Sequence, residues 1–321
     1  GTESGTSSRR EQRAERRGQT PAHRRAVALP RMAGLLRSNL VVAGGTALSR
    51  ITGLLRLIVL GYVLGQTALS DAYLIANETP NVVYELLLGG VLSATLVPLF
   101  STFVEQDDDE STNVVITVSV ILMAALTAVA VLAAPLIFGL YSIEVGAGVD
   151  PDVYRSVGTT LARIFLIQIL FYGLVGLANA FLNSRRRFFA AAWSPILPNL
   201  IIIAFLLSLP DPGRADWQLD EVLSNDRLRL TLGLGATVGI ASMALVLVPA
   251  VLRTGFRFRP NVDFRHPAVR KLLSLSFWTL GFVAANQAAL LVVRNLAEPG
   301  SSDASAYINA FTFFVLPHGL L

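Results

Sequence analysis

The chain has 321 residues, of which 53% are hydrophobic and only 15% are charged, with a formal net charge of +4. Its mean hydropathy of +0.58 is too high for a soluble domain of this length, so the sequence indicates a protein embedded in a bilayer. The absence of cysteine excludes disulfides and thiol chemistry, and the three histidines are too scattered to form a metal site. We therefore predict neither a metal nor a cofactor.

The first 38 residues form a basic segment that differs from the rest of the chain. Arg, Ser, Gly and Gln are frequent there, and apolar periodicity is absent. This composition predicts a disordered basic cytoplasmic arm over 1–38. The segment lacks the apolar centre of a signal peptide, and because it does not begin with Met we expect the native start upstream.

Continuous apolar runs follow this arm. A helix of about 20 mostly apolar residues spans the hydrocarbon core of a bilayer, and the runs lack the alternation that is typical of membrane β-barrels. We therefore predict an all-α integral membrane protein, a polytopic helical bundle. The expected spans are 39–65, 71–103, 113–140, 157–183, 188–209, 230–252 and 269–296, with a further one beginning at 303.

The distribution of Lys and Arg among the short loops predicts the orientation. If the N-terminus is cytoplasmic, the inside loops hold three consecutive arginines, 185–187, and a basic stretch from Arg253 to Lys271, whereas the outside loops hold only four arginines. Because cytoplasmic loops are enriched in Lys and Arg, we predict a cytoplasmic N-terminus, with Arg186 inside and Asp216 outside. The inside loops are then 104–112, 184–188 and 253–268, and the outside loops are 66–70, 141–156, 210–229 and 297–302.

The first span carries two arginines near its middle, Arg50 and Arg56. An arginine at the centre of a spanning helix costs about 2.5–3.5 kcal/mol on insertion scales, so it usually faces a polar cavity or a partner. The two would point about 120° apart on a straight helix, and Gly53 between them could bend the helix so that both face one space. We interpret them as ligands of an anion, with snorkelling to the headgroups as the alternative.

The second span carries acidic and amide side chains. Its acidic residues recur every seven positions, which places them near one face of the helix, and a proline in its middle should kink the helix. The acids could contact a ligand or simply neutralise Arg50 and Arg56, and Asp71 at the start of the span could equally be a helix N-cap. Arg163 and Arg294 lie near span ends and are expected at the interface. The candidate residues of the second span are Asp71, Asn77, Glu78, Pro80, Asn81 and Glu85.

Residues 49–100 resemble the opening of the MurJ/MviN family of lipid II flippases in the MOP exporter superfamily. The shared features are Ser-Arg followed six residues later by a second Arg (SRITGLLR), a Ser-Asp-Ala helix start and Pro-Asn pair (SDAYLIANETPN), and a Gly followed seven residues later by Val-Pro (GVLSATLVP). Weaker similarity continues through NAFLNSRRRFFAAAWSPILPNL to AYINAFTFFVLPHGLL, so the resemblance covers 38–321.

The resemblance implies two six-helix lobes around a central cationic cavity. This chain would hold the first lobe, 39–253, a basic cytoplasmic loop, 254–268, and the incomplete start of a second lobe, 269–321, with about two of its helices. Two segments of the chain hint at the duplication, because 70–80 and 302–317 share an Asp-Ala start, an Ala-Tyr pair and a downstream Pro. Parallel repeats of this kind are common among transporters.

From the resemblance we predict a flippase that moves lipid II, an undecaprenyl-diphosphate-linked peptidoglycan precursor, across the bacterial cytoplasmic membrane. Arg50 and Arg56 would clamp the diphosphate, because guanidinium groups match phosphate oxygens and remain charged. Asn77, Glu78, Asn81 and Glu85 would line the substrate site, and Gly53, Asp71 and Pro80 would serve structure or gating. The sequence shows no catalytic set or phosphate-binding loop, so we predict no enzymatic activity.

Other functions compete with this prediction. The acidic residues keep open an oligosaccharide-lipid or multidrug exporter of the same superfamily. A non-transporting envelope scaffold would instead use the basic loops, and a membrane glycosyltransferase would need a catalytic acid in 210–229. The expected partners are the lipid-linked diphosphate, membrane lipids and, through the cytoplasmic loops, cell-wall synthesis proteins, but no nucleic acid.

Overall fold

The computed structural model describes residues 21–84, 96–211, 213–214 and 217–315, and every regular element within those ranges is a helix. Side chains are described from Leu40 onward, except at 82–84, 275–284, 286, 287, 312 and 315. Two residues singled out from the sequence, Glu85 and Asp216, lie outside the described part. Contacts divide the chain into two units, 1–44 and 45–321, and the architecture below concerns the second unit.

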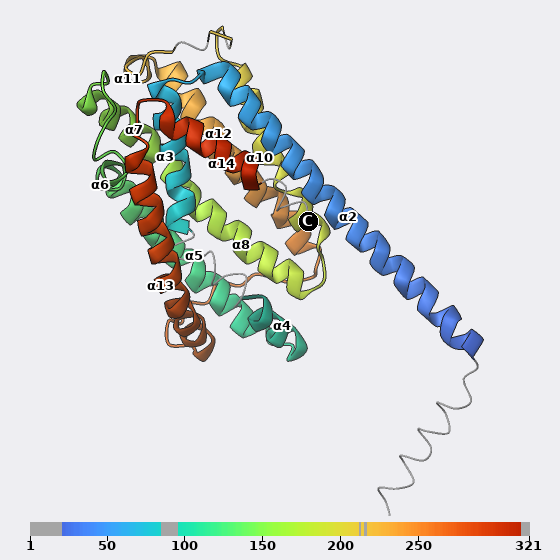
Figure 1. Ribbon diagram of the computed structural model, residues 1–321. Helices are drawn as coiled ribbons and strands as arrows, with labels where there is room; N and C mark the ends of the chain where they lie inside the picture. The colour runs from blue at the N-terminus through green and yellow to red at the C-terminus, as the bar shows by residue number, and fades with distance from the viewer. Residues whose placement is uncertain (1–20, 85–95, 212, 215–216, 316–321) are drawn as a thin grey trace, which may run out of the picture. The chain divides into compact units, whose positions relative to one another are not determined.

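The helices confirm the all-α membrane fold. Among the described residues, five stretches are long and apolar enough to cross a bilayer: Leu40–Leu64, Asp109–Leu132, Pro151–Ser184, Phe189–Leu207 and Asp226–Leu252. Figure 1 labels the helices, which are α2 (Pro21–Leu64), α3 (Ala68–Tyr84), α4 (Val97–Glu105), α5 (Asp109–Leu132), α6 (Ala134–Leu140), α7 (Pro151–Leu166), α8 (Gln168–Ser184), α9 (Phe189–Trp193), α10 (Ile196–Leu207), α11 (Glu221–Ser224), α12 (Asp226–Leu252), α13 (Pro267–Leu296) and α14 (Asp303–Val315).

Several helices begin outside the apolar runs from which they were predicted. α5 begins at Asp109 because the Asp108 side chain accepts a hydrogen bond from the Ser111 backbone N–H, at 2.9 Å. α7 begins at Pro151, and Asp150 caps it through the Asp152 N–H, at 2.8 Å. Polar caps therefore extend both helices beyond the spans expected from hydropathy. α2 begins at Pro21, within the segment expected as a disordered arm, where Ala, Arg and Leu favour helix.

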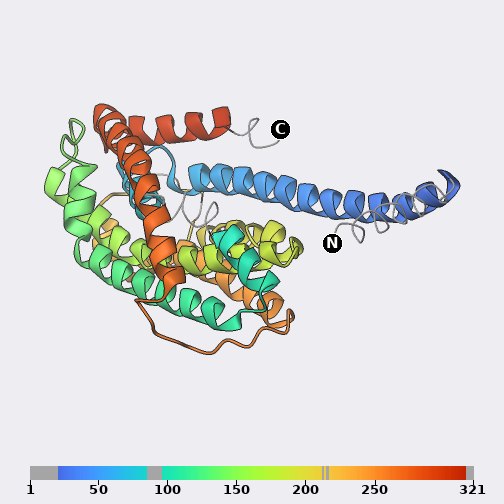
Figure 2. The same cartoon turned by 90° about the horizontal axis from the view of Figure 1, so that it is seen from below.

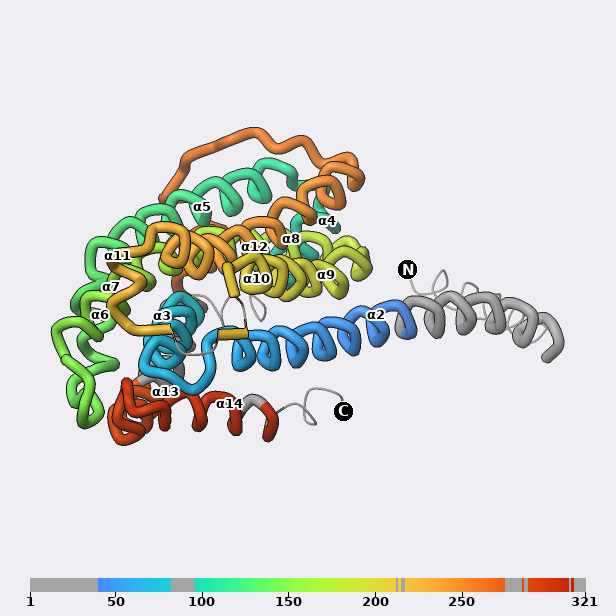
Figure 3. The backbone as a smooth tube through the Cα atoms, turned by 90° about the horizontal axis from the view of Figure 1, so that it is seen from above, coloured from blue at the N-terminus to red at the C-terminus, as the bar shows by residue number. Residues whose placement is uncertain are grey.

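The turns between helices gather at two ends of the bundle. We call one the Asp71 end, which holds the segments 65–67, 141–150, 208–211, 217–225 and 297–302 (Figure 1). The other is the Arg185 end, which holds 106–108, 185–188 and 253–266 (Figure 1). The helices run between these ends, with α10, α12 and α8 side by side (Figure 3). α13 and α14 meet in a sharp turn at the Asp71 end (Figure 2).

The apolar core joins α3 to the helices around it. Tyr73 of α3 is almost fully buried and packs edge-on against Phe165 of α7, with ring centroids 5.4 Å apart. Gly158 lets α6 approach α7, because a Cβ at that position would lie 1.9 Å from Phe138. Small residues allow close packing of this kind in membrane helices. The apolar side of α3 is thus packed against α7, which in turn packs against α6.

The Asp108 cap yields a first prediction. Asp108→Ala should remove the cap of α5 and destabilise it by about 1 kcal/mol. Hydrogen bonds from Ser111 lower the pKa of the Asp108 carboxyl, so its contribution is present above the unfolded pKa of about 3.9 and is lost as the pH falls through the lower folded value. Thermal unfolding of the purified chain in detergent should show a larger difference at pH 7 than at pH 3. Glu105→Ala, at an exposed position nearby, is the control.

Candidate functional site

The two arginines of α2 lie on a helix that is held in place by an amide. Asn199 of α10 donates through its side chain to the Ser49 carbonyl, at 3.2 Å, and to the Thr52 hydroxyl, at 3.1 Å. α2 continues as one helix through Gly53, where a Cβ would lie 3.6 Å from the Asn199 amide nitrogen. That distance is an ordinary contact, so the Asn199 hydrogen bonds, and not the small size of Gly53, hold α10 to the segment that carries both arginines.

Arg50 and Arg56 are available to a ligand. Arg50 is exposed and Arg56 is half-buried. Neither has an ion-pair partner among the described residues. Arg56 lies near enough to Tyr73 of α3 to interact with it electrostatically. Within the described part of the chain, the guanidinium groups of α2 therefore have no neutralising acid, and that of Arg56 lies near α3.

α3 also carries two of the candidate amide side chains. Asn77 and Asn81 are half-buried, and Pro80 between them is buried. α3 continues through Pro80 to Tyr84. The Pro80 nitrogen carries no hydrogen, so the helix lacks one backbone hydrogen bond at this level.

Glu78 has a partner that the sequence analysis did not assign to it. Arg294 of α13 donates through Nη2 to Glu78 Oε2, forming an ion pair. Arg294 is only 6% exposed, although it lies in the last turn of α13, near the end of its expected span. The alternative in which Glu78 neutralises Arg50 or Arg56 is wrong, because α13 supplies the cation. The long, flexible arginine side chain allows a residue near a helix end to reach inward.

Asp71 caps a helix, but not its own. Its carboxylate accepts backbone hydrogen bonds from Gly300 and Ser302, each at 3.0 Å, and from Ser305, at 2.8 Å. These donors form the turn that leads into α14, so Asp71 of α3 satisfies the orphan N–H groups of a helix more than two hundred residues later. The sequence suggested an N-cap role, and the structure assigns that role to α14.

Further hydrogen bonds fasten the same turn at the Asp71 end. Asn295 accepts from the Ile143 N–H and donates to the Leu140 carbonyl, each at 2.9 Å. The Gly146 N–H donates to the Pro299 carbonyl at 2.9 Å, and the Ser302 hydroxyl donates to the Gln66 carbonyl at 3.0 Å. The turn between α13 and α14 is therefore bonded to both the α2–α3 turn and the α6–α7 turn.

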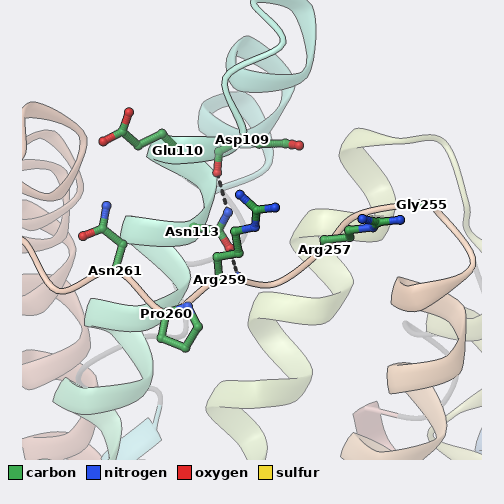
Figure 4. A pocket seen from close by; sticks show the side chains of 8 residues that line it. All are labelled: Asp109, Glu110, Asn113, Gly255, Arg257, Arg259, Pro260 and Asn261. Carbon is green, nitrogen blue, oxygen red and sulfur yellow. Dashed lines mark hydrogen bonds between the residues drawn. The ribbon is translucent and has the colours of Figure 1, made fainter.

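A second polar site lies at the Arg185 end. The extended segment 253–266 passes along the outer side of α5 (Figure 3). The Arg259 N–H donates to Asn113 Oδ1 at 2.7 Å, and the Asn261 N–H donates to the Thr117 hydroxyl at 3.1 Å. Figure 4 shows the resulting pocket, about 610 Å³ in volume, which is lined by Arg257, Arg259, Asp109 and Glu110 among others, with Arg259 beside Asn113. Because its charges balance, this pocket is a weaker anion site than α2.

The structure therefore separates the residues that the sequence grouped together. Asp71 and Glu78 bond the segment 294–305, whereas no such bond joins Arg50, Arg56, Asn77 or Asn81 to another described side chain. Arg294 and Asn295 were missed as structural partners of the first helices. Two opposite charges within apolar spans were the only sequence signal that could have paired Glu78 with Arg294.

Comparison with known proteins identifies relatives over most of the chain. The family model of the lipid II flippase MurJ matches residues 60–321. The lipid II flippase MurJ of Burkholderia cenocepacia is 25% identical over 283 residues, covering 86% of this chain and 52% of the relative. A probable lipid II flippase MurJ of Rhizobium meliloti is 28% identical over 298 residues, covering 89% of this chain and 52% of the relative.

A solved structure has the same fold. The chain superposes on a lipid II flippase MurJ in an inward closed conformation with a TM-score of 0.67 and 21% sequence identity, over 88% of this chain and 56% of that one. The chain thus spans about half the length of the relatives it matches. The family match, the shared helical fold and the membrane-spanning helices agree, and the chain belongs to the MurJ family of lipid II flippases.

Proposed function

We propose that this chain forms the first half of a carrier that moves a lipid-linked diphosphate, lipid II, across the bacterial cytoplasmic membrane. The observation that carries the proposal is the pair of arginines on α2, which lie in an apolar span without an ion-pair partner among the described residues. An unneutralised cation in a membrane span is costly, so its retention favours a role in binding an anion. Guanidinium forks suit the oxygens of a diphosphate.

The other candidate residues support this role from α3. Asn77 and Asn81 are half-buried and can hydrogen-bond sugar hydroxyls or phosphate oxygens. Glu78 is engaged by Arg294 and so does not compete for the arginines of α2. The carrier needs no bond-making chemistry, and we propose a transporter without enzymatic activity. Basic loop 254–268 is proposed as the contact for cell-wall synthesis proteins.

Binding of lipid II tests the proposal. The purified chain in lipid nanodiscs should bind lipid II at least about tenfold more tightly than undecaprenol, which lacks the charged diphosphate, a difference of about 1.4 kcal/mol. Native mass spectrometry of nanodisc samples at several lipid concentrations measures both affinities. Equal affinities for the charged and the neutral lipid would reject the anion site.

We also propose that the Arg185 end is cytoplasmic and the Asp71 end faces outward, in keeping with the bias of Lys and Arg toward the former. The chain has no native cysteine, so single cysteines report accessibility without background. In intact cells, an impermeant maleimide should label Asp220→Cys but not Arg186→Cys, and both positions are exposed. Labelling of Arg186→Cys alone would reverse the proposed orientation.

A further inference from the structure

The ion pair between Glu78 and Arg294 joins two parts of the chain that belong to different repeats. Glu78 lies on α3, in the first set of helices, and Arg294 lies 216 residues later on α13, one turn before the bend into α14. By the duplication noted in the sequence, α13 begins the second set of helices. The pair therefore crosses the boundary between the two halves.

The surroundings of Arg294 show a cation that is enclosed but incompletely satisfied. The face of its guanidinium lies over the Tyr141 ring, 5.1 Å from the centroid, which adds a cation–π contact from the α6–α7 turn. Its Nη1 atom is buried and has no hydrogen-bond partner among the described residues. Burying a charge with an unused donor is unfavourable, and this cost offsets much of the attraction of the pair.

Glu78 differs from its partner in exposure. Its side chain is 31% exposed, whereas that of Arg294 is 7% exposed. Water can therefore reach the carboxylate while the guanidinium remains enclosed. An ion pair is suited to separate and re-form when water reaches one partner and the other has an unused hydrogen-bond donor. A buried pair with all its hydrogen bonds made would hold permanently.

The neighbouring contacts indicate what the pair holds. Asn295 fastens the end of α13 to the α6–α7 turn, and Asp71 fastens the start of α14 to α3. These contacts all lie at the Asp71 end, on the same short segment of the second half. Separation of the halves at this end requires the Glu78–Arg294 pair to break.

We propose that Glu78 and Arg294 form a reversible latch that closes the Asp71 end of the carrier. The latch rests on the proposed transport function, since it matters only if the two halves move apart. Arg294 acts as a positioning residue: it holds α13 against α3 in the closed state and is released to water in the open state. Neutralising either residue alone leaves the other without its partner and favours opening.

Cysteine accessibility in nanodiscs tests the latch without reference to orientation. Ala304 on α14 is 1% exposed, so Ala304→Cys should react slowly with a maleimide, and its rate reports the open fraction. Arg294→Gln or Glu78→Gln should raise this rate at least about tenfold, or about 1.4 kcal/mol in the opening equilibrium. The charge swap Glu78→Arg with Arg294→Glu should return the rate toward that of the parent.

The controls separate opening from unfolding. Ala306→Cys, at an exposed position two residues further along α14, should react at the same rate in every background. Arg229→Gln removes a half-buried arginine whose ion pair with Asp226 stays within α12, and it should leave the Ala304→Cys rate unchanged. If a single variant fails to fold, the neutral double variant Glu78→Gln with Arg294→Gln takes its place, again with a raised rate expected.

Two results would overturn the latch. One is an unchanged Ala304→Cys rate in the single or neutral double variants, and the other is a charge swap that reacts as fast as the single variants. Lipid II binding measured on the same nanodiscs keeps the two proposals apart. A parent chain that does not bind lipid II counts against the transport function, whereas normal binding with unchanged labelling counts against the latch alone.

Discussion

Alanine in place of Arg50 or Arg56 should lower the affinity of the chain for lipid II by about 10- to 100-fold, because a hydrogen bond to a charged group contributes about 1.5–3 kcal/mol. The folded protein should still insert, since removing an unpaired intramembrane charge eases insertion. Lysine at either position should restore only part of the affinity, because an ammonium keeps the charge but loses the bidentate fork. Native mass spectrometry in nanodiscs measures these affinities.

The structure sharpens this experiment in two ways. Arg163→Ala provides a matched control, because Arg163 is an exposed arginine in the membrane-spanning stretch Pro151–Ser184 but lies on α7. A second change, Glu78→Gln, should not rescue Arg56→Ala, because Glu78 is paired with Arg294. Rescue by that double variant, or full binding by both alanine variants, would mean that the arginines serve the acidic residues of α3 and not a ligand.

The second large effect, a loss of local stability in the turn before α14, is expected on substitution of Asp71. Asp71→Ala removes the acceptor of three backbone N–H groups, from Gly300, Ser302 and Ser305. Each buried donor left unsatisfied costs about 1–3 kcal/mol, so the turn before α14 should lose several kcal/mol of local stability. Hydrogen exchange of the amides in 298–306 should accelerate by at least about a hundredfold, since about 1.4 kcal/mol corresponds to each factor of ten.

Two further variants accompany Asp71→Ala, one with an intermediate effect and one as a control. Asp71→Asn retains one acceptor oxygen and should give an intermediate acceleration. Asp303→Asn changes an exposed acid in the first turn of α14 and should leave exchange in 298–306 as in the parent. Equal exchange in Asp71→Ala and the parent would mean that the carboxylate does not hold this turn.

Much of the fold was predictable because the bilayer imposes a simple rule. Every spanning backbone must satisfy its hydrogen bonds internally, so long apolar runs become helices, and the runs containing α2, α5, α8, α10 and α12 were found from hydropathy alone. Helix ends were predicted less well. Asp108 and Asp150 extend α5 and α7 through polar turns that hydropathy does not register.

The candidate site was predictable in composition but not in pairing. Arg50 and Arg56 stood out because a charge within an apolar span is costly wherever it points. The partner of Glu78 depended on which helix packs against α3, and α13 approaches it from 216 residues further along the chain. Spacing within one helix carries no information about such a neighbour.

The sequence by itself determined that this is a helical membrane protein, where its apolar spans lie, which intramembrane side chains carry charge and which family it resembles. These properties follow from local composition, because transfer into a bilayer and helix formation act on each segment separately. Only the tertiary structure decided that Asp71 caps α14, that Glu78 holds Arg294 and that the arginines of α2 have no ion-pair partner among the described residues. Ion pairs and caps between distant segments depend on how the helices pack, which a single sequence does not specify residue by residue.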